Sequence, residues 1–452
     1  MGLFTDLWRR VRSMFERTDL KRVLGGEIEL TAQMIDSIDL WQSMLTGSAP
    51  WTDKTPSMGL ESGICREFAD VAINEMQAKV EDNESLDQIF QMAIRELNEN
   101  LQDGLALGSL IIKPLLGGRI EYVTADNFMP IRFDNGRPTD CVFIERKQIN
   151  ENKFYHRLER HTLMPAGLTI TNKAYQSTSS ARIGAQVSLD AVEAWAGLPS
   201  EISYPGMDKI DFGYYRNPLK NRIDNSQCGI SIYAGPAIDR IKAADIQAAR
   251  LDWEYESGER AIHVDERALK TTRGGKKVMA ETHERLYRGF NIDQKNDELF
   301  KEYSPAMRDG SYRQGLESAL RRVEFAVGLA YGDLSDAQYV EKTATEIKTA
   351  KQRKYNRVAA IQENLKDCLE DLVDALAFYN SSYTTSYSLS CSFNDSILTD
   401  EEAERNQDRQ DVSMGAMRLE EYRAKWYGED IETALANLPE QAGSVLDNLP
   451  VE

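Results

Sequence analysis

The sequence contains little histidine and cysteine, and their positions exclude several kinds of site. The spacing of the four histidines matches neither zinc ligation nor a metalloprotease motif, and they stand at His156, His161, His263 and His283. The five cysteines form no closely spaced pair that would indicate a metal knuckle or a redox motif, and they are Cys65, Cys141, Cys228, Cys368 and Cys391. We interpret the cysteines as free thiols of a reducing compartment and the histidines as ordinary structural residues. We therefore expect no cofactor and no metal, and only a site made of Asp and Glu alone stays open.

The chain also lacks an excess of positive charge and any long apolar run. It carries 54 Lys and Arg against 73 Asp and Glu, for a net charge of −19. DNA-binding domains usually carry a basic footprint, so this balance argues against tight, sequence-specific DNA binding. No apolar run reaches transmembrane length. The N-terminal stretch 1–15 is basic and amphipathic, which fits a helix docked on the protein's own body or, as the alternative, one lying on a membrane surface.

Catalytic motifs are missing too. The stretch Gly274-Gly-Lys-Lys277 lacks the upstream Gly and the following Ser or Thr of a phosphate-binding loop. The stretch Gly229-Ile-Ser-Ile-Tyr233 has Tyr where a nucleophile elbow needs its last Gly, so we expect Ser231 to cap or turn the chain. We therefore predict no catalytic residues and no enzyme.

Periodicity predicts an α+β protein. Helical spacing covers much of 1–45, interrupted at Gly25-Gly26, then 67–73, and then a helix capped by Ser85 with its apolar stripe reaching Leu101. Short β-type runs separated by Gly-containing turns follow from Gly108 to Asn172, and we expect one sheet packed on the preceding helices. A Ser- and Tyr-rich β-type run covers 383–393, and acidic helices cover 399–415 and 419–438.

Two unlike helices flank a short insertion in the middle of the chain. The first starts after Pro236, where a missing N–H costs nothing, and runs to about Gly258. We expect the insertion to form a strand over 260–264, a short helix over 281–289 and a second strand over 298–303. The second helix covers 311–331, and an acidic break then leads into a much longer helix.

The start of that last helix concentrates basic residues in an acidic protein. These are Lys342, Lys348, Lys351, Arg353, Lys354 and Arg357. One interpretation is a solvated face or ion pairs with neighbouring subunits, and the other is a lining that meets phosphates transiently. Further along, apolar residues alternate in steps of three and four from Val358 to Tyr379. Such a seam needs a packing partner, either the protein's own body or a neighbouring subunit.

The serial order of these segments resembles that of portal proteins of tailed bacteriophages, particularly the lineage common in long-tailed phages and prophages of Gram-positive bacteria. The residues that carry the resemblance are Phe212-Gly-Tyr-Tyr-Arg-Asn-Pro218, Gly229 to Tyr233 with the Ala-rich helix after it, Lys342-Thr-Ala-Thr-Glu-Ile347, and Phe393-Asn-Asp-Ser-Ile397. The resemblance covers about residues 30 to 430. Gly315 and Gly328 both fall inside the expected second stem helix, so its ends stay open.

The resemblance implies a portal-like fold with a helical stem, a small β-α-β clip, a mixed α/β wing and a helical crown. Its parts are an N-terminal helical arm (1–45), the wing (46–234), a first stem helix (235–259), the clip (260–310), a second stem helix (311–332), a tunnel loop (333–342), a long wing helix (343–380), the crown (381–430) and a C-terminal tail (431–452).

A portal protein forms a homo-oligomeric ring, typically a dodecamer, at one vertex of the capsid in the virion, after assembly in the host cytoplasm. The resemblance therefore implies a channel for packaging and ejection of double-stranded DNA, held without sequence specificity. It further implies docking of the terminase large subunit, later a head-completion or connector protein, and nucleation of the procapsid with scaffolding and major capsid proteins. It implies no membrane partner.

The same resemblance assigns roles to particular residues. The tunnel loop would comprise Asp333, Leu334, Ser335, Asp336, Ala337, Gln338, Tyr339 and Val340. Lys342 and Lys348 would lie near DNA, while Lys351, Arg353, Lys354 and Arg357 would contact either DNA or a neighbouring subunit. Arg273, Lys276 and Lys277 would mark the clip surface for the motor or connector. The alternatives are another virion head component and a nuclease or phosphodiesterase with a carboxylate metal site.

Overall fold

The computed structural model is a mixed α+β structure that divides into two compact units, Met1–Ser392 and Phe393–Glu452. It describes residues 17–25, 28–115, 118–180, 182–265, 270–271, 277–278, 287–290, 300–336, 344–380, 386–393 and 401–438. Within these residues the chain forms eleven α-helices and several sheets, and all sheet pairings whose register is defined are antiparallel except one. The predicted α+β class is thus confirmed at this coarse level. Among the described helices, none combines the length and the apolarity needed to cross a membrane.

Helices open the first unit, and most of their apolar faces are buried. Thr31 and Asn83 cap two of them through side chains that accept hydrogen bonds from backbone N–H groups in the first turn. The helices are α2 (Arg17–Leu24), α3 (Ala32–Leu45), α4 (Leu60–Ile73), α5 (Glu84–Ala93) and α6 (Leu97–Leu107). The predicted cap at Ser85 is wrong, because Asn83 caps α5 two residues earlier. The apolar stripe that was predicted to follow one helix as far as Leu101 belongs to two helices, α5 and α6.

The β-rich block forms two sheets where one was expected. A meander built on long neighbouring strands comprises β4 (Phe128–Asp134), β5 (Arg137–Asn150), β6 (Lys153–Met164), β7 (Gly167–Ser177) and β8 (Ala185–Val187), with β9 (Glu201–Pro205) also paired to β7. Asn135 and Gly136 both take positive φ between β4 and β5, which is the two-residue hairpin turn that the Asn-Gly pair predicts. Two short 3-10 turns follow β8, at Leu189–Ala191 and Glu193–Trp195.

The second sheet lies against the long helix α9 (Ala344–Tyr379). Its order is β10–β2–β3, with β10 (Gly213–Arg216), β2 (Ser109–Leu115) and β3 (Arg119–Thr124). The predicted seam of α9 is buried in this packing, with Val358, Leu365 and Cys368 fully covered. Gly213 permits the close approach, because a Cβ there would lie 2.5 Å from the carbonyl oxygen of Cys368. The seam is therefore filled by the chain's own body. A separate two-stranded pair joins β1 (Met76–Glu81) to β16 (Ser388–Phe393).

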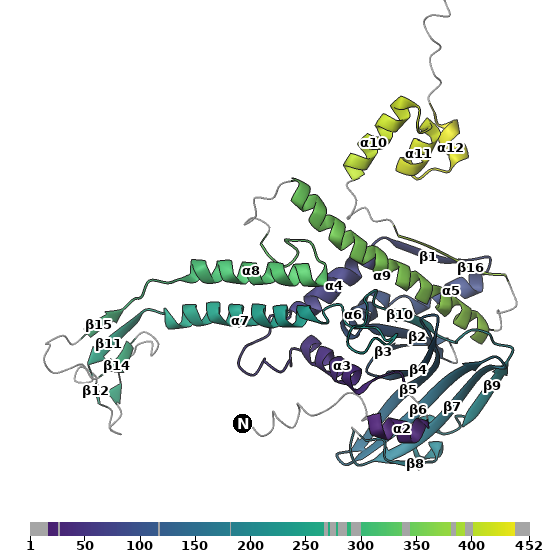
Figure 1. Cartoon of the computed structure of the whole chain (residues 1–452), viewed down its shortest axis with the longest axis horizontal. Coiled ribbons are helices and arrows are strands. Elements are labelled where there is room, and N and C mark those ends of the chain that lie inside the picture. The colour runs from purple at the N-terminus through teal and green to yellow at the C-terminus, as the bar shows by residue number, and fades with distance from the viewer. Residues whose placement is uncertain are drawn as a thin grey trace, which may run out of the picture. The chain divides into compact units, whose positions relative to one another are not determined.

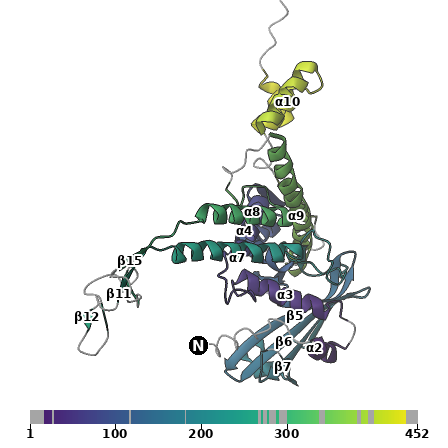
Figure 2. The same ribbon diagram turned by 60° about the vertical axis from the view of Figure 1, so that its left-hand side comes forward.

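Two helices, α7 (Pro236–Ser257) and α8 (Asp309–Val327), run side by side in both views of the molecule (Figures 1 and 2). Arg308, just before α8, binds the carboxylate of Glu254 on α7 at 2.8 Å. Further along, the two helices come so close that a Cβ added at Gly315 would lie 2.4 Å from Nε2 of Gln247. These contacts define the antiparallel pairing of the two helices, which we call the α7–α8 hairpin.

Short strands connect the two helices of this hairpin. They are β11 (Ala261–Asp265), β12 (Lys270–Thr271), β13 (Lys277–Val278), β14 (Tyr287–Phe290) and β15 (Phe300–Tyr303). β11 pairs with β14 in parallel and with β15 in the antiparallel sense. The predicted outer strands of the insertion are confirmed. The helix predicted over 281–289 is wrong at 287–289, which belong to β14, and 281–286 lie outside the described residues. The described part of the insertion is thus made of strands.

The second unit contains α10 (Glu401–Met414), α11 (Leu419–Tyr427) and α12 (Ile431–Ala436). One helix was predicted over 419–438. The structure divides it, because Gly428 takes a φ of 66° and ends α11 in the left-handed conformation. Asp430 then caps α12 by accepting from the backbone N–H of Thr433.

Candidate nucleic-acid interface

The segment Gly328–Asp336 follows α8, and its residues 333–336 are the described part of the predicted tunnel loop. Helix α8 ends at Val327, and Gly328 caps it with a φ of 93°, a conformation that favours glycine. The predicted second stem helix, 311–332, is therefore too long at its C-terminal end and two residues late at its start. Asp309 begins the helix, and the loop starts five residues before the predicted boundary of Asp333.

Glu324, in the last turns of α8, accepts hydrogen bonds from the backbone of this segment. Its side chain is fully buried, and its Oε1 accepts hydrogen bonds from the backbone N–H groups of Gly332 (3.0 Å) and Leu334 (2.7 Å). Ser335 adds both its backbone N–H at 2.8 Å and its hydroxyl at 3.1 Å. Hydrogen bonds to an ionised acceptor are stronger than neutral ones. One carboxylate therefore fixes the course of the chain between Gly332 and Ser335.

Lys354 ties the same segment to the body of the first unit. Its buried ammonium group lies 3.1 Å from Oδ2 of Asp333 and also pairs with Glu67 on α4. Asp333 in turn accepts from the backbone N–H of Ala330 at 3.0 Å. The structure thus brings two predicted site residues, Asp333 and Lys354, together within one chain.

Two other cations of the basic cluster also contact the end of α8. The guanidinium of Arg353 lies over the rings of Phe325, at 4.8 Å, and Tyr331, at 5.2 Å, which is a cation–π arrangement. Arg357 lies beside Gly328, where an added Cβ would come within 3.2 Å of its Nε. Burial lowers the pKa of Arg357 from its ordinary value. By contrast, Lys351 is exposed.

The remaining predicted residues lie outside what the structure describes or have undescribed side chains. Lys348 and Lys277 belong to α9 and β13, and nothing is described of their side chains. The other predicted residues lie outside the described residues altogether, and they are Ala337, Gln338, Tyr339, Val340, Lys342, Arg273 and Lys276. Their assignment to a tunnel loop, to DNA proximity or to motor docking stays a prediction.

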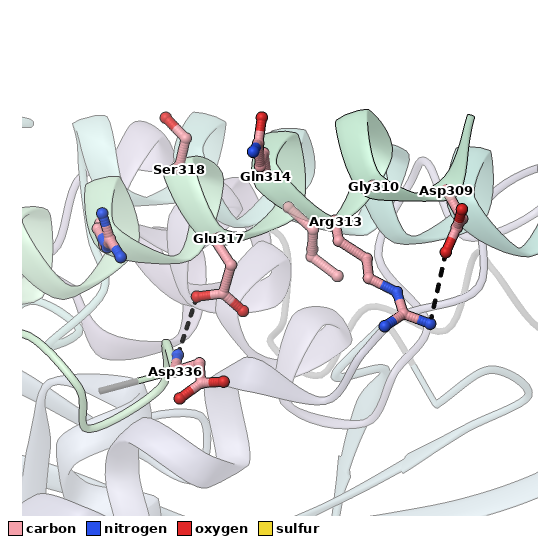
Figure 3. A pocket seen from close by; sticks show the side chains of 9 residues that line it. Asp309, Gly310, Arg313, Gln314, Glu317, Ser318 and Asp336 are labelled. Atoms are coloured by element: carbon pink, nitrogen blue, oxygen red, sulfur yellow. Dashed lines mark hydrogen bonds and ion pairs between the residues drawn. The ribbon is translucent and has the colours of Figure 1, made fainter. Parts of the chain in front are cut away.

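A hollow of about 550 Å³ lies along α8 beside this segment (Figure 3). Its labelled side chains come from α8 and from Asp336, whose backbone N–H donates to Glu317 at 2.8 Å. Arg313 reaches Asp309 at 3.7 Å along one side of the hollow. A second hollow, of about 850 Å³, lies between the start of α7 and the end of α8, where Arg240, Arg322 and Phe325 line it. Neither combines a nucleophile with a base held within hydrogen-bonding reach of it.

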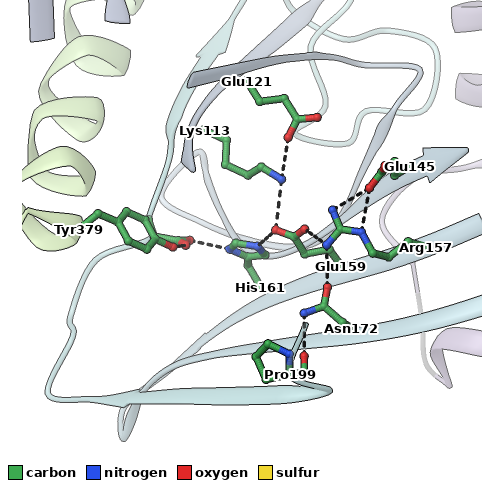
Figure 4. A network of polar contacts seen from close by, with 10 residues as sticks. Lys113, Glu121, Glu145, Arg157, Glu159, His161, Asn172, Pro199 and Tyr379 are labelled. Atoms are coloured by element: carbon green, nitrogen blue, oxygen red, sulfur yellow. Dashed lines mark hydrogen bonds and ion pairs between the residues drawn. The ribbon is translucent and has the colours of Figure 1, made fainter. Parts of the chain in front are cut away.

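A network of buried charges, missed by the sequence reasoning, joins the two sheets to the end of α9 (Figure 4). His161 on β6 lies between Asp211, at 2.7 Å, and Glu159, at 2.8 Å. The hydroxyl of Tyr379 on α9 donates to Asp211. Lys113, only 2% exposed on β2, pairs with Glu159 and with Glu121. The sequence did contain an indication of this network. A lysine stands inside the apolar run Leu110 to Leu115, and lysines are rarely buried unless they are paired.

Ion pairs within this network shift the pKa values of His161 and Asp211 away from their ordinary values. Burial alone would lower the pKa of His161, but Asp211 and Glu159 outweigh it and raise that pKa to about 9. Burial would raise the pKa of Asp211, yet His161 and Tyr379 hold it below its ordinary value. The pattern is that of a structural ion network, in which imidazolium and carboxylates neutralise one another. His161 is thus a core histidine with partners, as the sequence reasoning favoured.

Two smaller predictions, on Ser231 and on the cysteines, are confirmed. Ser231 accepts from the backbone N–H of Tyr233 at 3.2 Å, which confirms that it turns the chain. All five cysteines are free thiols, also as predicted. Among the described residues, no group of three or more His, Cys, Asp or Glu side chains is placed to hold a metal ion.

No protein-family model and no curated protein matches the chain. The structure itself defines a two-unit α+β protein with a long helical hairpin.

Proposed function

We propose that the chain is a portal protein of a tailed bacteriophage, a ring-forming subunit of the channel through which double-stranded DNA enters and leaves the capsid. In this proposal it is not an enzyme. The terminase large subunit supplies the work and docks on the strands between α7 and α8, and a connector protein later takes its place. Scaffolding and major capsid proteins assemble around the ring, which becomes part of the virion.

One observation carries the proposal: the serial order around the α7–α8 hairpin. Two long antiparallel helices are separated by a strand insertion, and the second leads through the segment Gly328–Asp336 toward the 36-residue helix α9. This order supports a stem, a clip, a tunnel loop and a long wing helix. The helices α10 and α11 would then belong to the crown, and α12 to the C-terminal tail. Because the same fold can serve different functions, the electrostatics of the loop give a second, independent line of support.

The charge distribution supports a channel that lets DNA slide. A net charge of −19 keeps a duplex away from the walls, and a few cations at the loop give brief, salt-screened phosphate contacts. Lys354 and Arg353 are engaged by Glu67, Asp333, Phe325 and Tyr331. The proposal therefore gives the DNA contacts to Lys342 and Lys348, with exposed Lys351 as a third candidate.

Electron microscopy of the purified protein tests the ring directly. A closed ring with a central hole wide enough for a duplex is the expected result, with twelve subunits in the assembled particle. A protein that stays monomeric at all concentrations, alone and with its scaffolding and capsid proteins, contradicts the proposal.

A packaging assay tests the DNA path. The double variant Lys342→Glu/Lys348→Glu should form rings yet package DNA at least about tenfold less well, since two phosphate contacts become repulsive. Lys366→Glu is the matched control, because Lys366 is exposed on the same helix α9 and stands 22 residues after its first residue, Ala344, which is about 33 Å along the helix. Equal packaging by the double variant and the control would show that Lys342 and Lys348 do not touch DNA.

A further inference from the structure

The α7–α8 hairpin has two outer edges with different surfaces. Gln247 and Gly315 mark where the helices face each other. Because each residue turns a helix by about 100°, Trp253 lies roughly 120° around α7 from Gln247. By the same arithmetic Gln314, Glu317 and Arg321 lie roughly 100–160° around α8 from Gly315. Trp253 therefore lies on a side of α7 that does not face α8. In the hollow of Figure 3, Gln314, Glu317 and Arg321 lie on a side of α8 that does not face α7, whereas Arg313 reaches Tyr255 on α7.

The α7 edge presents a protruding indole. Trp253 is 59% exposed, which is unusual for so large an apolar side chain on a surface. Asp252 and Glu256 are exposed near it on the same helix. Tryptophan is enriched among the residues that dominate protein–protein binding energy. This edge therefore combines an aromatic knob with two carboxylates.

The α8 edge presents a matching hollow. Gly310 contributes no side chain to it, and an added Cβ there would meet nothing within 4 Å. The carboxylates of Asp309 and Glu317 line it and can accept a hydrogen bond from an indole N–H. Arg321 also lines it, and its buried Nε has no hydrogen-bond partner among the described residues. A guanidinium in this position can stack on an indole or pair with an incoming carboxylate.

Knob and hollow lie at the same level along the hairpin. Arg308 binds Glu254, and Arg313 donates to the hydroxyl of Tyr255 at 2.6 Å. Trp253 thus stands level with the part of the hollow that Asp309, Gly310 and Arg313 line. A second hairpin placed alongside the first, without a shift along its axis, would present its Trp253 to this hollow.

We propose that Trp253 of one copy inserts into the hollow between Asp309 and Arg321 of a second copy. Asp252 and Glu256 then approach Arg321 of the second copy, whose buried Nε has no hydrogen-bond partner among the described residues, so an ion pair can accompany the aromatic contact. The two surfaces differ, so the contact is head-to-tail and repeats from copy to copy until a ring closes. The inference deepens the proposed portal function by naming the surfaces that join its subunits, and it rests on that function only for the closure of the ring.

Two single variants test the contact without touching the core. Trp253→Ala removes the knob from an exposed helical position, where alanine is the best helix former. Gly310→Tyr fills the hollow from a site with free space around it. Each variant alone should lose the ring and run as a monomer in analytical ultracentrifugation. Met92→Glu, a change at an exposed apolar residue of α5, is the control and should assemble like the unaltered protein.

Mixing the two variants gives the decisive result. The Gly310→Tyr copy keeps its knob and the Trp253→Ala copy keeps its hollow, so one productive contact remains per pair. The equimolar mixture should form a heterodimer and stop there, because the other two surfaces are disabled.

The remaining outcomes overturn the inference in distinguishable ways. Rings that persist in either variant would show that subunits join through other surfaces, and the proposed function would stand. A mixture that stays monomeric, or that grows beyond two copies, rejects the head-to-tail contact between these edges. An unaltered protein that never associates removes both the contact and the ring.

Discussion

Glu324 and Ser335 are joined by three hydrogen bonds, from the backbone N–H and the hydroxyl of Ser335 to the buried carboxylate of Glu324. The serine lies eleven residues further along the chain, beyond the end of α8. A single side chain of the helix therefore determines how the following loop begins. In the proposed portal, this arrangement sets the starting direction of the segment that approaches DNA.

Glu324→Ala should loosen the segment Gly328–Asp336 more than it affects the rest of the molecule. Removing the carboxylate leaves the N–H groups of Gly332, Leu334 and Ser335 without their acceptor, and we expect a loss of about 3 kcal/mol in the free energy of unfolding. Urea unfolding measures that loss, and hydrogen exchange should show faster exchange at residues 332–335. Glu363→Ala, at an exposed position on α9, should change neither. Unaltered exchange in Glu324→Ala would contradict the role given to Glu324.

The pKa of His161 predicts a loss of stability at alkaline pH. That pKa is raised in the folded protein to about 9, so the unfolded chain releases its proton first as pH rises. The stabilisation is complete below the unfolded pKa of about 6.5 and disappears as pH passes through about 9, with a magnitude of about 3 kcal/mol. Urea unfolding at pH values from 6 to 10 should show this decline, which the His161→Gln variant should lack. His161→Gln should also be less stable at pH 6, since Asp211 and Glu159 lose their cation. An equal decline in both proteins would assign the effect to other groups.

The elements were largely predictable from the sequence, whereas the contacts of the site were not. Periodicity located α7, α9 and most strands, because burial of one face imposes period 3.6 or period 2 directly on the sequence. The boundary at Val327 was missed, since Gly315 and Gly328 look alike in sequence although one faces Gln247 and the other caps the helix. The pairing of Lys354 with Glu67 and Asp333 was also missed. The three residues are far apart in the sequence, and no local sequence pattern indicates a contact between such distant residues.

The approach of β10 to α9 makes Gly213 intolerant of any side chain. A Cβ at that position would lie 2.5 Å from the backbone oxygen of Cys368 and 3.1 Å from its Sγ. Since neither backbone nor buried sulfur can move away cheaply, Gly213→Ala should cost about 2–3 kcal/mol. Thermal unfolding measures the cost. Gly63→Ala is the matched control, because its Cβ meets nothing within 4 Å in α4 and alanine favours a helix by up to about 1 kcal/mol. Equal stability of the two variants would show that the sheet and α9 can separate to make room.

The buried ammonium group of Lys354 should matter for stability, whereas the exposed one of Lys351 should not. Lys354→Met leaves Asp333 and Glu67 without their shared cation, and we expect a loss of about 1–3 kcal/mol, limited by the partial exposure of Glu67. Lys351→Met, three residues earlier on the same helix, should unfold at the same temperature as the unaltered protein. A DNA-packaging assay distinguishes a structural role from a role in contacting DNA. Rings of Lys351→Met should be stable, so a loss of packaging in this variant comes from the missing positive charge alone. If Lys354→Met were as stable as Lys351→Met, the pair with Asp333 would contribute nothing to holding the loop.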